Sequence, residues 1–504
     1  MAEKNTSLSA PAQGPNVSFV RKELQNLKEQ YELISDCLEG SKKIKRETTK
    51  YLPKPSEVDE DDASRYEAYL KRAVFYNVTK RTLSGLLGQI FLRKPVVEIP
   101  TTLDPLKDNA SGSGVTLDQL ASMTAGEDIS FGRAGLFVDY PKTDAPATQK
   151  DILEGKVRPS ILFYKSKDII NWRTEFKNGK EMLSLVVLFE SRVENDDGFE
   201  QTYLEQLRVL RLVEGLYEVH LYVKASTQYE LTEVFTPTDA KGARLTEIPF
   251  TFVGVNNNDA NIDEPPLYDL AELNVAHYRN SADYEEACFI CGQPTPALSG
   301  LTEDWVKNVM KGKVVLGSRS AIMLPVGGTA ELIQAEANTM PKEAMEAKER
   351  QMVALGAKLV QEKSVQRTAT EAGFENTAEI SVLASIAKNV ENAITACLKW
   401  SAIFVGAEAA NIKYKLNSEF DLTQLTSLDR SQLLSELQGG GITFKEYREN
   451  LRRAGIATLD DKDAIAELKQ NETDGIGRTP PIDPNQLLKV NSGKKPASDK
   501  PAAA

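Results

Sequence analysis

Apolar and polar residues alternate along the chain in patterns that predict helices at both ends and strands between them. The first helical pattern covers Phe19–Glu39, with apolar residues recurring every three or four positions. These residues are Val20, Leu24, Leu27, Tyr31 and Ile34. A second, long helix is expected to open at the acidic run Glu57–Asp62, because carboxylates stabilise a helix N-terminus. Its pattern continues to Arg93-Lys94-Pro95.

The stretch from Pro95 to Pro249 carries short β-rich runs separated by turn residues. The expected strands are Gly135–Tyr140, Ser160–Tyr164, Leu183–Glu190, Leu207–Val213, Tyr217–Val223 and Glu230–Phe235. A helix is expected among them at Leu117–Ser130. This stretch is therefore predicted to be α+β, with antiparallel hairpins.

Helical patterns return after the polar loop Gly254–Glu264 and dominate the rest of the chain. The expected helices are Leu267–Phe289, Lys342–Lys363, Phe374–Val405, Thr423–Gln438, Thr443–Ala454 and Lys462–Glu472. A Gly- and Pro-rich insert, strand-like at Lys313–Gly317, separates the first two, and the polar stretch Ser364–Gly373 separates the next two. The fold class is thus α+β and largely helical. Residues 1–16 and those after Asp474 are expected to be disordered.

Composition narrows the class of protein. The chain has 504 residues and a formal charge of 61 − 73 = −12, and 41% of its residues are hydrophobic. These values exclude a wholly disordered chain or a collagen, and the apolar runs are shorter than the ~20 residues of a membrane span. No secretion signal is expected, and four Cys do not make a disulfide framework. The acidic balance disfavours a protein that clings to nucleic acid but allows one past which DNA slides.

Candidate catalytic chemistry is sparse. The sequence lacks a G-x-x-x-x-G-K-[ST] phosphate loop, and its two histidines are His220 and His277. Cys288-x-x-Cys291 resembles a metal or redox motif, but a structural role is favoured because suitably spaced further ligands are missing. The run Glu57–Asp62 is interpreted as a helix start in preference to a metal site. We expect no catalytic residues, no metal, no cofactor and no enzymatic activity.

Four blocks of sequence, taken in order, resemble the tailed-bacteriophage portal proteins, in a branch long catalogued as a domain of unknown function. They are Tyr51-Leu52-Pro53 with Ala73–Pro95, Tyr164–Arg173, Ile248–Gly300, and Arg367-Thr368-Ala369-Thr370-Glu371. The resemblance covers roughly Tyr51 to Glu472. It implies a homo-oligomeric ring, usually of twelve subunits, at one vertex of the capsid.

The resemblance also implies how the chain divides. Residues 1–50 would be an N-terminal segment and helix, 51–260 the wing, 261–290 a stem helix and 291–337 the clip. Residues 338–405 would hold the second stem helix, the tunnel loop and the wing–crown helix. Residues 406–473 would form the crown, and 474–504 a C-terminal tail.

Two sets of candidate channel residues follow. By resemblance, Lys363, Arg367, Thr368 and Thr370 belong to the tunnel loop that approaches DNA; the alternative is an ordinary connection in which Thr368 or Thr370 caps the next helix. The first stem helix is acidic and carries Asp269, Glu272, Asp283, Glu285 and Glu286. These acids would either face the bore and repel phosphates or form a solvated outer face, and sequence leaves both open.

As a portal, the protein would contact copies of itself, the large terminase subunit, head-completion, adaptor and tail proteins, and the major capsid and scaffold proteins. Double-stranded DNA would pass without sequence preference, and no membrane would be involved. The protein would be made in the host cytoplasm and reside in the virion. The alternatives are a head–tail adaptor, usually much shorter, and a terminase or nuclease, which needs a phosphate loop or an acidic metal triad.

Overall fold

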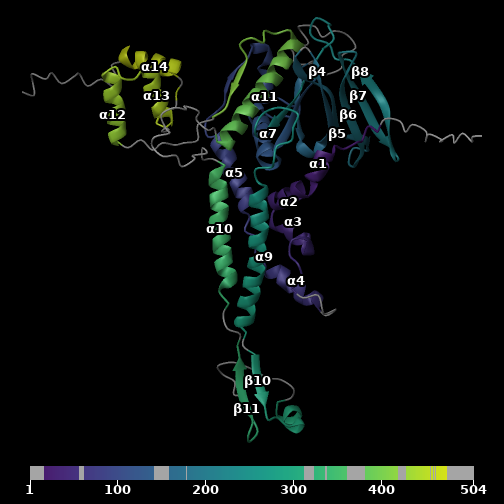
Figure 1. Ribbon diagram of the computed structural model, residues 1–504, viewed down its shortest axis with the longest axis vertical. Helices are drawn as coiled ribbons and strands as arrows, with labels where there is room; N and C mark the ends of the chain where they lie inside the picture. The colour runs from purple at the N-terminus through teal and green to yellow at the C-terminus, as the bar shows by residue number, and fades with distance from the viewer. Residues whose placement is uncertain are drawn as a thin grey trace, which may run out of the picture. The chain divides into compact units, whose positions relative to one another are not determined.

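The computed structural model describes residues 16–55, 62–140, 158–177, 179–293, 295–310, 323–334, 338–359, 381–417, 427–453, 456–457, 459 and 461–473. The chain divides into two compact units, Met1–Phe420 and Asp421–Ala504, which are described separately (Figure 1). Within the described residues, no helix has the length and apolar character that crossing a membrane requires.

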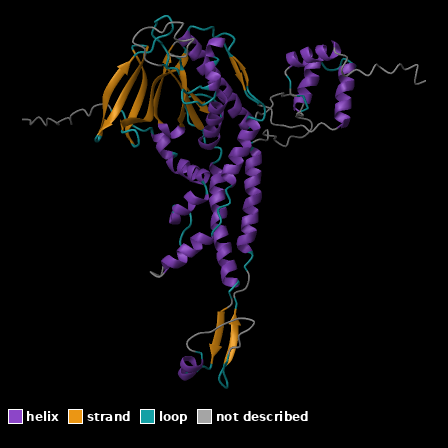
Figure 2. Ribbon diagram, turned by 180° about the vertical axis from the view of Figure 1, so that it is seen from behind, coloured by secondary structure: helices purple, strands orange, loops and turns teal. Residues whose placement is uncertain are grey.

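Two antiparallel sheets pack face to face in the first unit (Figure 2). The smaller has the order β3-β2-β9, with β2 at Arg133–Asp139, β3 at Ser160–Lys165 and β9 at Phe250–Gly254. The larger is a meander of β4 to β8 in chain order. Its strands are Ile169–Lys177, Lys180–Asp196, Gln201–Val213, Leu216–Ala225 and Gln228–Phe235. The predicted α+β class and its antiparallel hairpins are confirmed.

Side chains of β2 alternate between two cores, because successive residues of a strand point to opposite faces. Phe137 belongs to the core between the sheets, together with Trp172 and Phe252. Leu136 and Val138 belong to the core under the helices. That helical layer contains α7 (Leu117–Phe131), α11 (Val382–Val405) and α5 (Val78–Ile90). The central strand is therefore buried on both faces.

A third core surrounds α9 (Tyr268–Cys291). Packed around it are α2 (Lys28–Glu39), α3 (Ser41–Arg46) and α4 (Asp62–Arg72), while α10 (Met340–Lys358) lies along α9. The shorter elements are α1 (Lys22–Asn26), α6 (Pro105–Asp108), β1 (Val96–Glu98), β12 (Lys413–Lys415), β10 (Thr295–Ser299) and β11 (Thr329–Ile333). Strands β1 and β12 pair with each other, as do β10 and β11.

Two predicted helices are interrupted. The pattern at Phe19–Glu39 divides at Leu27 into α1 and α2. The long helix expected to reach Pro95 divides into α4 and α5, separated by residues 73–77. Ala73 and Phe75 are buried in the α9 core, and the Asn77 side chain accepts a hydrogen bond from the backbone N–H of Lys80, which starts α5 afresh.

Other boundaries differ less. The expected strands correspond to β2, β3 and β5 to β8, whereas β1, β4, β9, β10, β11 and β12 were not predicted. The expected helix Phe374–Val405 is described from Val382, after the capping residue Ser381. The strand-like Lys313–Gly317 lies outside the described residues, as do the terminal segments expected to be disordered, apart from Asn16.

The second unit contains the three helices expected near the C-terminus. They are α12 (Ser427–Gln438), α13 (Phe444–Arg453) and α14 (Asp461–Thr473). Thr443 caps α13, since its hydroxyl oxygen accepts from the backbone N–H of Glu446 at 3.2 Å. Arg448 ties α13 to α14 by donating to Asp461 Oδ1 at 3.3 Å and to the Leu459 carbonyl at 2.7 Å.

Candidate functional site

Helices α9 and α10 form an antiparallel pair joined through the β10–β11 hairpin (Figure 1). His277 Nε2 lies 3.2 Å from Glu349 Oε1, and Lys348 Nζ donates to Asn280 Oδ1 at 2.6 Å. Beyond these contacts, Gln334 Nε2 donates to the Cys291 carbonyl at 3.1 Å. The sequence separations in these pairs shrink toward the hairpin, as two antiparallel helices joined at one end require.

The buried side of α9 follows the helical repeat. Ala271, Val275, Tyr278 and Ala282 pack into the core shared with α2 and α4. Polar residues of the same helix, Asn274, His277 and Ser281, are also buried. Helix α9 is therefore enclosed over much of its circumference.

Asn274 holds the start of α5 against α9. Its Oδ1 accepts from the backbone N–H of Val78 at 3.1 Å and from the backbone N–H and hydroxyl of Thr79 at 3.2 and 3.0 Å. Its Nδ2 donates to the Tyr76 carbonyl at 2.7 Å. These contacts satisfy N-terminal amides of α5 that the helix itself leaves unpaired.

The five candidate acids of α9 separate into two groups. Glu286 forms ion pairs with Arg72 and Arg65, and Asp283 accepts from the Tyr69 hydroxyl at 2.6 Å. These two acids therefore face α4 of their own chain. Glu285 is half-buried.

The other two acids, Asp269 and Glu272, are exposed near the start of α9. Glu272 Oε1 accepts from the Tyr268 hydroxyl at 2.8 Å. That hydrogen bond, followed by burial and by the charges of Glu272, Asp269 and Glu29, raises the pKa of Tyr268. Glu29, Asp269 and Glu272 thus form one acidic patch around Tyr268, across α2 and α9.

The tunnel-loop candidates Lys363, Arg367, Thr368 and Thr370 lie outside the described residues. Described structure ends at Leu359 and resumes at Ser381, whose hydroxyl accepts from the backbone N–H of Ala384 at 3.2 Å. Because Ser381 is the cap of α11, neither Thr368 nor Thr370 caps that helix. The assignment of these residues to a tunnel loop stays a prediction.

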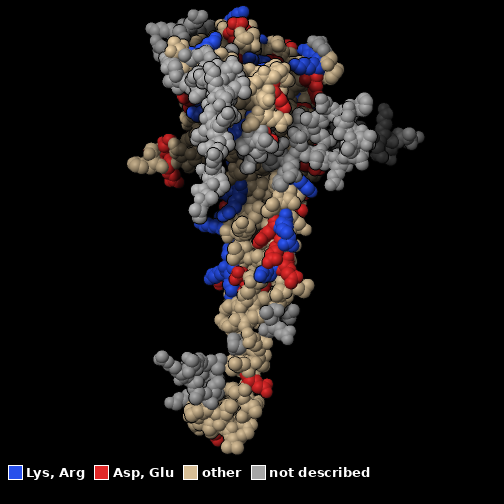
Figure 3. All heavy atoms as spheres, turned by 90° about the vertical axis from the view of Figure 1, so that its left-hand side faces the viewer, with Lys and Arg blue, Asp and Glu red and all other residues tan. Residues whose placement is uncertain are grey.

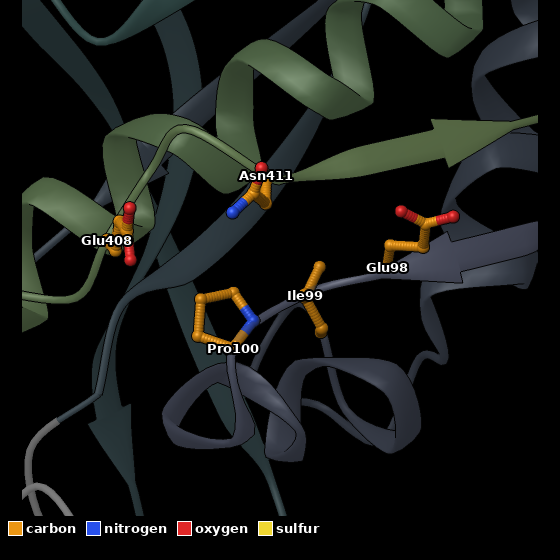
Figure 4. A pocket seen from close by; sticks show the side chains of 5 residues that line it. All are labelled: Glu98, Ile99, Pro100, Glu408 and Asn411. Carbon is orange, nitrogen blue, oxygen red and sulfur yellow. The ribbon is translucent and has the colours of Figure 1, made fainter.

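The described residues that could bind a metal ion or take part in redox chemistry do not gather at one site. The described residues contain no group of three or more His, Cys, Asp and Glu side chains that could hold a metal ion. Cys288 is exposed and Cys291 half-buried at the end of α9. His220 lies on β7 with its Nε2 2.9 Å from Glu218 Oε2, in keeping with a strand residue. A shallow hollow lined by Glu98, Ile99, Pro100, Glu408 and Asn411 lies beside the β1–β12 pair (Figure 4).

A buried charged cluster near the end of α7 was not anticipated. The Asp128 carboxylate is fully buried, and neither oxygen has a hydrogen-bond partner among the described residues. Burial, followed by the charges of Asp263 and Glu127, raises its pKa. The apolar repeat Leu117, Leu120 and Ala121 places Asp128 on the buried face, so the helical period could have revealed it.

Arg133 is buried close by, between two aromatic rings. Its guanidinium lies 3.7 Å from the ring centroids of both Trp172 and Phe252, and burial lowers its pKa to about 9. Arg21 lies 4.4 Å from the Trp172 ring and donates to the Trp172 carbonyl, so the N-terminal segment is fastened to the same place. This arrangement stacks cations on aromatic faces, which stabilises a fold and supplies no catalytic base or nucleophile.

The described molecule is thus a mixed α/β protein with two packed sheets, a helical layer and a helix–hairpin–helix segment. A family model described as Domain of unknown function (DUF4055) matches residues 266–405, the stretch from α9 to the end of α11. No curated protein matches the chain.

Two solved structures are similar over most of the chain. One is a chain from the virion of a native gene transfer agent (GTA) particle, at 12% identity and a TM-score of 0.39, covering 82% of this chain and 99% of that one. The other is from the neck of an empty GTA particle, at 13% identity and a TM-score of 0.40, covering 81% and 97%. At these scores the likeness carries no argument about function.

Proposed function

We propose that this protein is a structural component of a tailed-phage head–tail assembly, and specifically its portal. Twelve copies would form a ring at one capsid vertex, through which double-stranded DNA enters during packaging and leaves during ejection. The observation that carries this proposal is the antiparallel α9–α10 pair with the β10–β11 hairpin between its helices. Stem, clip and stem are the parts that the sequence resemblance implies in this order.

The electrostatics of the chain suit a conduit better than a nucleic-acid clamp. The chain carries a formal charge of −12, with 73 Asp and Glu against 61 Lys and Arg. Acids that line a bore would repel phosphates and let DNA slide, whereas tight binding requires clustered cations that neutralise phosphates. The proposed tunnel-loop cations, Lys363 and Arg367, would supply one weak, sequence-independent contact per copy.

The proposal assigns partners and a location but no catalysis. The large terminase subunit would dock during packaging, and head-completion, adaptor and tail proteins would dock afterwards. Capsid and scaffold proteins would surround the ring at the virion vertex. ATP hydrolysis would belong to the motor, so the purified chain should have no nucleotidase or nuclease activity.

Mass photometry of the purified protein, followed by negative-stain imaging, tests the proposal. Twelve copies of the 55.6 kDa chain give a species of roughly 670 kDa with a central hole. Assembly is repeated with the cognate scaffold protein, since a ring can depend on it. A chain that stays monomeric under both conditions, or that hydrolyses ATP or cuts DNA, would contradict the proposal.

A further inference from the structure

We infer that neighbouring copies join through two oppositely charged surfaces of this chain, an exposed face of α5 on one copy and the acidic patch of α2 and α9 on the next. The inference rests on the proposed ring, and it names the residues that form each joint. The α5 face consists of Lys80, Arg81, Ser84, Gly85 and Gly88, and the acidic patch of Glu29, Asp269 and Glu272.

The α5 face is basic and lacks a partner within the described part of the chain. Helix α5 carries two cations, Lys80 and Arg81, and no acid. Lys80 and Arg81 form no ion pair with a described residue, and the Arg81 guanidinium lies 5.6 Å from the centroid of the exposed Tyr76 ring. The opposite side of α5, with Thr79, Leu86 and Ile90, is buried.

The surface of α5 also allows a close approach. A Cβ added at Gly85 or at Gly88 would meet no atom within 4 Å, so both glycines open directly to solvent. Packed helices approach to 8–10 Å between axes, and small side chains favour the shorter distance. Beside this face, Val74 and Tyr76 are 52% and 44% exposed. Apolar side chains next to cations fit a protein partner better than a phosphate backbone.

The acidic patch has the complementary composition. Glu29, Asp269 and Glu272 are exposed; Asp269 and Glu272 are three residues apart on α9, and Glu29 belongs to α2, which packs against α9. Glu272 is held by the Tyr268 hydroxyl, which leaves its second carboxylate oxygen available to a cation. Like charges gathered on one surface are unfavourable alone and are relieved by a surface of opposite charge.

In Figure 1, α5 is drawn on the α10 side of α9 and α2 on the other side, and α2 and α5 also contact each other where Asn77 Nδ2 donates to the Cys37 carbonyl. Figure 3 looks onto the side on which Figure 1 draws α10, and shows Lys and Arg side chains together with Asp and Glu side chains on that face. A joint between different surfaces of identical copies is heterologous, and such joints close into rings when the rotation between copies allows. A second copy of this chain is therefore the partner.

Charge reversal tests the joint. One variant carries Lys80→Glu and Arg81→Glu, and the other carries Asp269→Lys and Glu272→Lys. Either variant alone presents two surfaces of like charge and should lose the ring. Mixed in equal amounts, the two variants offer a native joint and a reversed joint in alternation, so the ring should return. Lys180→Glu with Arg192→Glu, and Glu175→Lys with Glu181→Lys, make equal charge changes at exposed sites on β4 and β5 and should leave the ring intact.

Mass photometry and negative stain give the readout, and circular dichroism establishes that each variant is folded. Rings from either variant alone, or a mixture that stays unassembled, would overturn the joint and leave the proposed portal standing. If the α5 variant forms normal rings but fails to package DNA, the basic face contacts DNA and the joint is wrong. A wild type that never forms rings contradicts the portal and the joint together.

Discussion

Gly132 ends α7 in a backbone conformation that few side chains adopt. Its φ is +74°, and an added Cβ would lie 2.5 Å from the Asp263 carbonyl oxygen. We expect Gly132→Ala to lower the free energy of unfolding by about 2–4 kcal/mol, from left-handed strain and from the clash with backbone. Urea unfolding followed by circular dichroism measures the change.

The matched control lies in the same helix. A Cβ at Gly126 would be 3.5 Å from Leu87 Cδ1, which is ordinary contact. Gly126→Ala should therefore be neutral or raise stability by up to about 1 kcal/mol through helix propensity. Equal effects of the two substitutions would show that Gly132 is not constrained as described.

Glu127 should make the fold less stable as pH rises. Burial raises its pKa to about 7 from an ordinary value of 4.5, although the backbone N–H of Ser166 donates to it at 2.9 Å. The folded state thus holds this proton more tightly than the unfolded state. The contribution of this proton to the free energy of unfolding is fully present below pH 4.5. It is lost as pH rises through 7, and it amounts to at most about 3 kcal/mol. Burial also raises the pKa of Asp128, so that residue likewise lowers stability as pH rises.

Glu127→Gln isolates this effect, because the amide oxygen can still accept from Ser166. The variant should match the wild type at pH 5 and exceed it in urea midpoint at pH 8. The exposed Glu175→Gln, measured in parallel, should show no such divergence. A wild type and Glu127→Gln with parallel pH profiles would refute a raised pKa.

At the scale of elements, Asn274 determines where α5 begins. Replacing Asn274 with Leu would leave the backbone N–H and the hydroxyl of Thr79 without the oxygen that accepts from both, at about 1–3 kcal/mol each, while the Val78 N–H keeps its hydrogen bond to the Tyr76 carbonyl. We expect a total loss of about 2–5 kcal/mol and a larger increase in amide hydrogen exchange at Thr79 than at Val78. The control Asn280→Leu removes one bond, to the Lys348 ammonium, which water can replace, so its cost should stay below about 1 kcal/mol.

The interruption between α4 and α5 shows what local pattern can predict. Ala73, Val74, Phe75 and Tyr76 continue the apolar repeat, so the sequence favours an unbroken helix. Contacts with α9, far along the chain, interrupt the helix instead. The Ser281 hydroxyl accepts from the backbone N–H of Val74 at 3.0 Å, and Asn274 Oδ1 accepts from the backbone N–H of Val78 at the start of α5. Helices α7 and α9 were predicted to within about two residues because local signals mark their ends: Thr116 and Gln119 form a capping box at the start of α7, Gly132 ends it, and Pro265-Pro266 precede α9.

The sequence predicts which acidic residues α9 carries, but it does not predict which residues those acids face. The acids of α9 are evident from sequence, but the partners of Asp283 and Glu286 are Tyr69 and Arg72, each 214 residues away. No local pattern encodes such a pairing. The same holds for the short strand β9, whose place beside β2 depends on tertiary packing.

At the scale of the whole molecule, the charges are partitioned between surfaces. Cations gather on α5, acids on the α2–α9 patch, and acids near the end of α9 are neutralised by α4. A monomer gains nothing from separating unpaired charges in this way, whereas a ring of copies pairs them at every joint. The net charge of −12 then keeps the assembled surface repulsive toward phosphate.

The second unit should be dispensable for the stability of the first. The buried residues of the four hydrophobic clusters in the described structure all precede Asn417. A chain ending at Phe420 should therefore keep the thermal midpoint of the first unit to within about 2 °C, because it loses none of that buried area. A chain ending at Asn411 is the control: it also lacks β12 with the buried Ile412, Tyr414 and Leu416, at about 1.5–3 kcal/mol for each side chain. Calorimetry of both should show a large drop for the shorter chain only, and an equal drop for the longer one would mean that the two units stabilise each other.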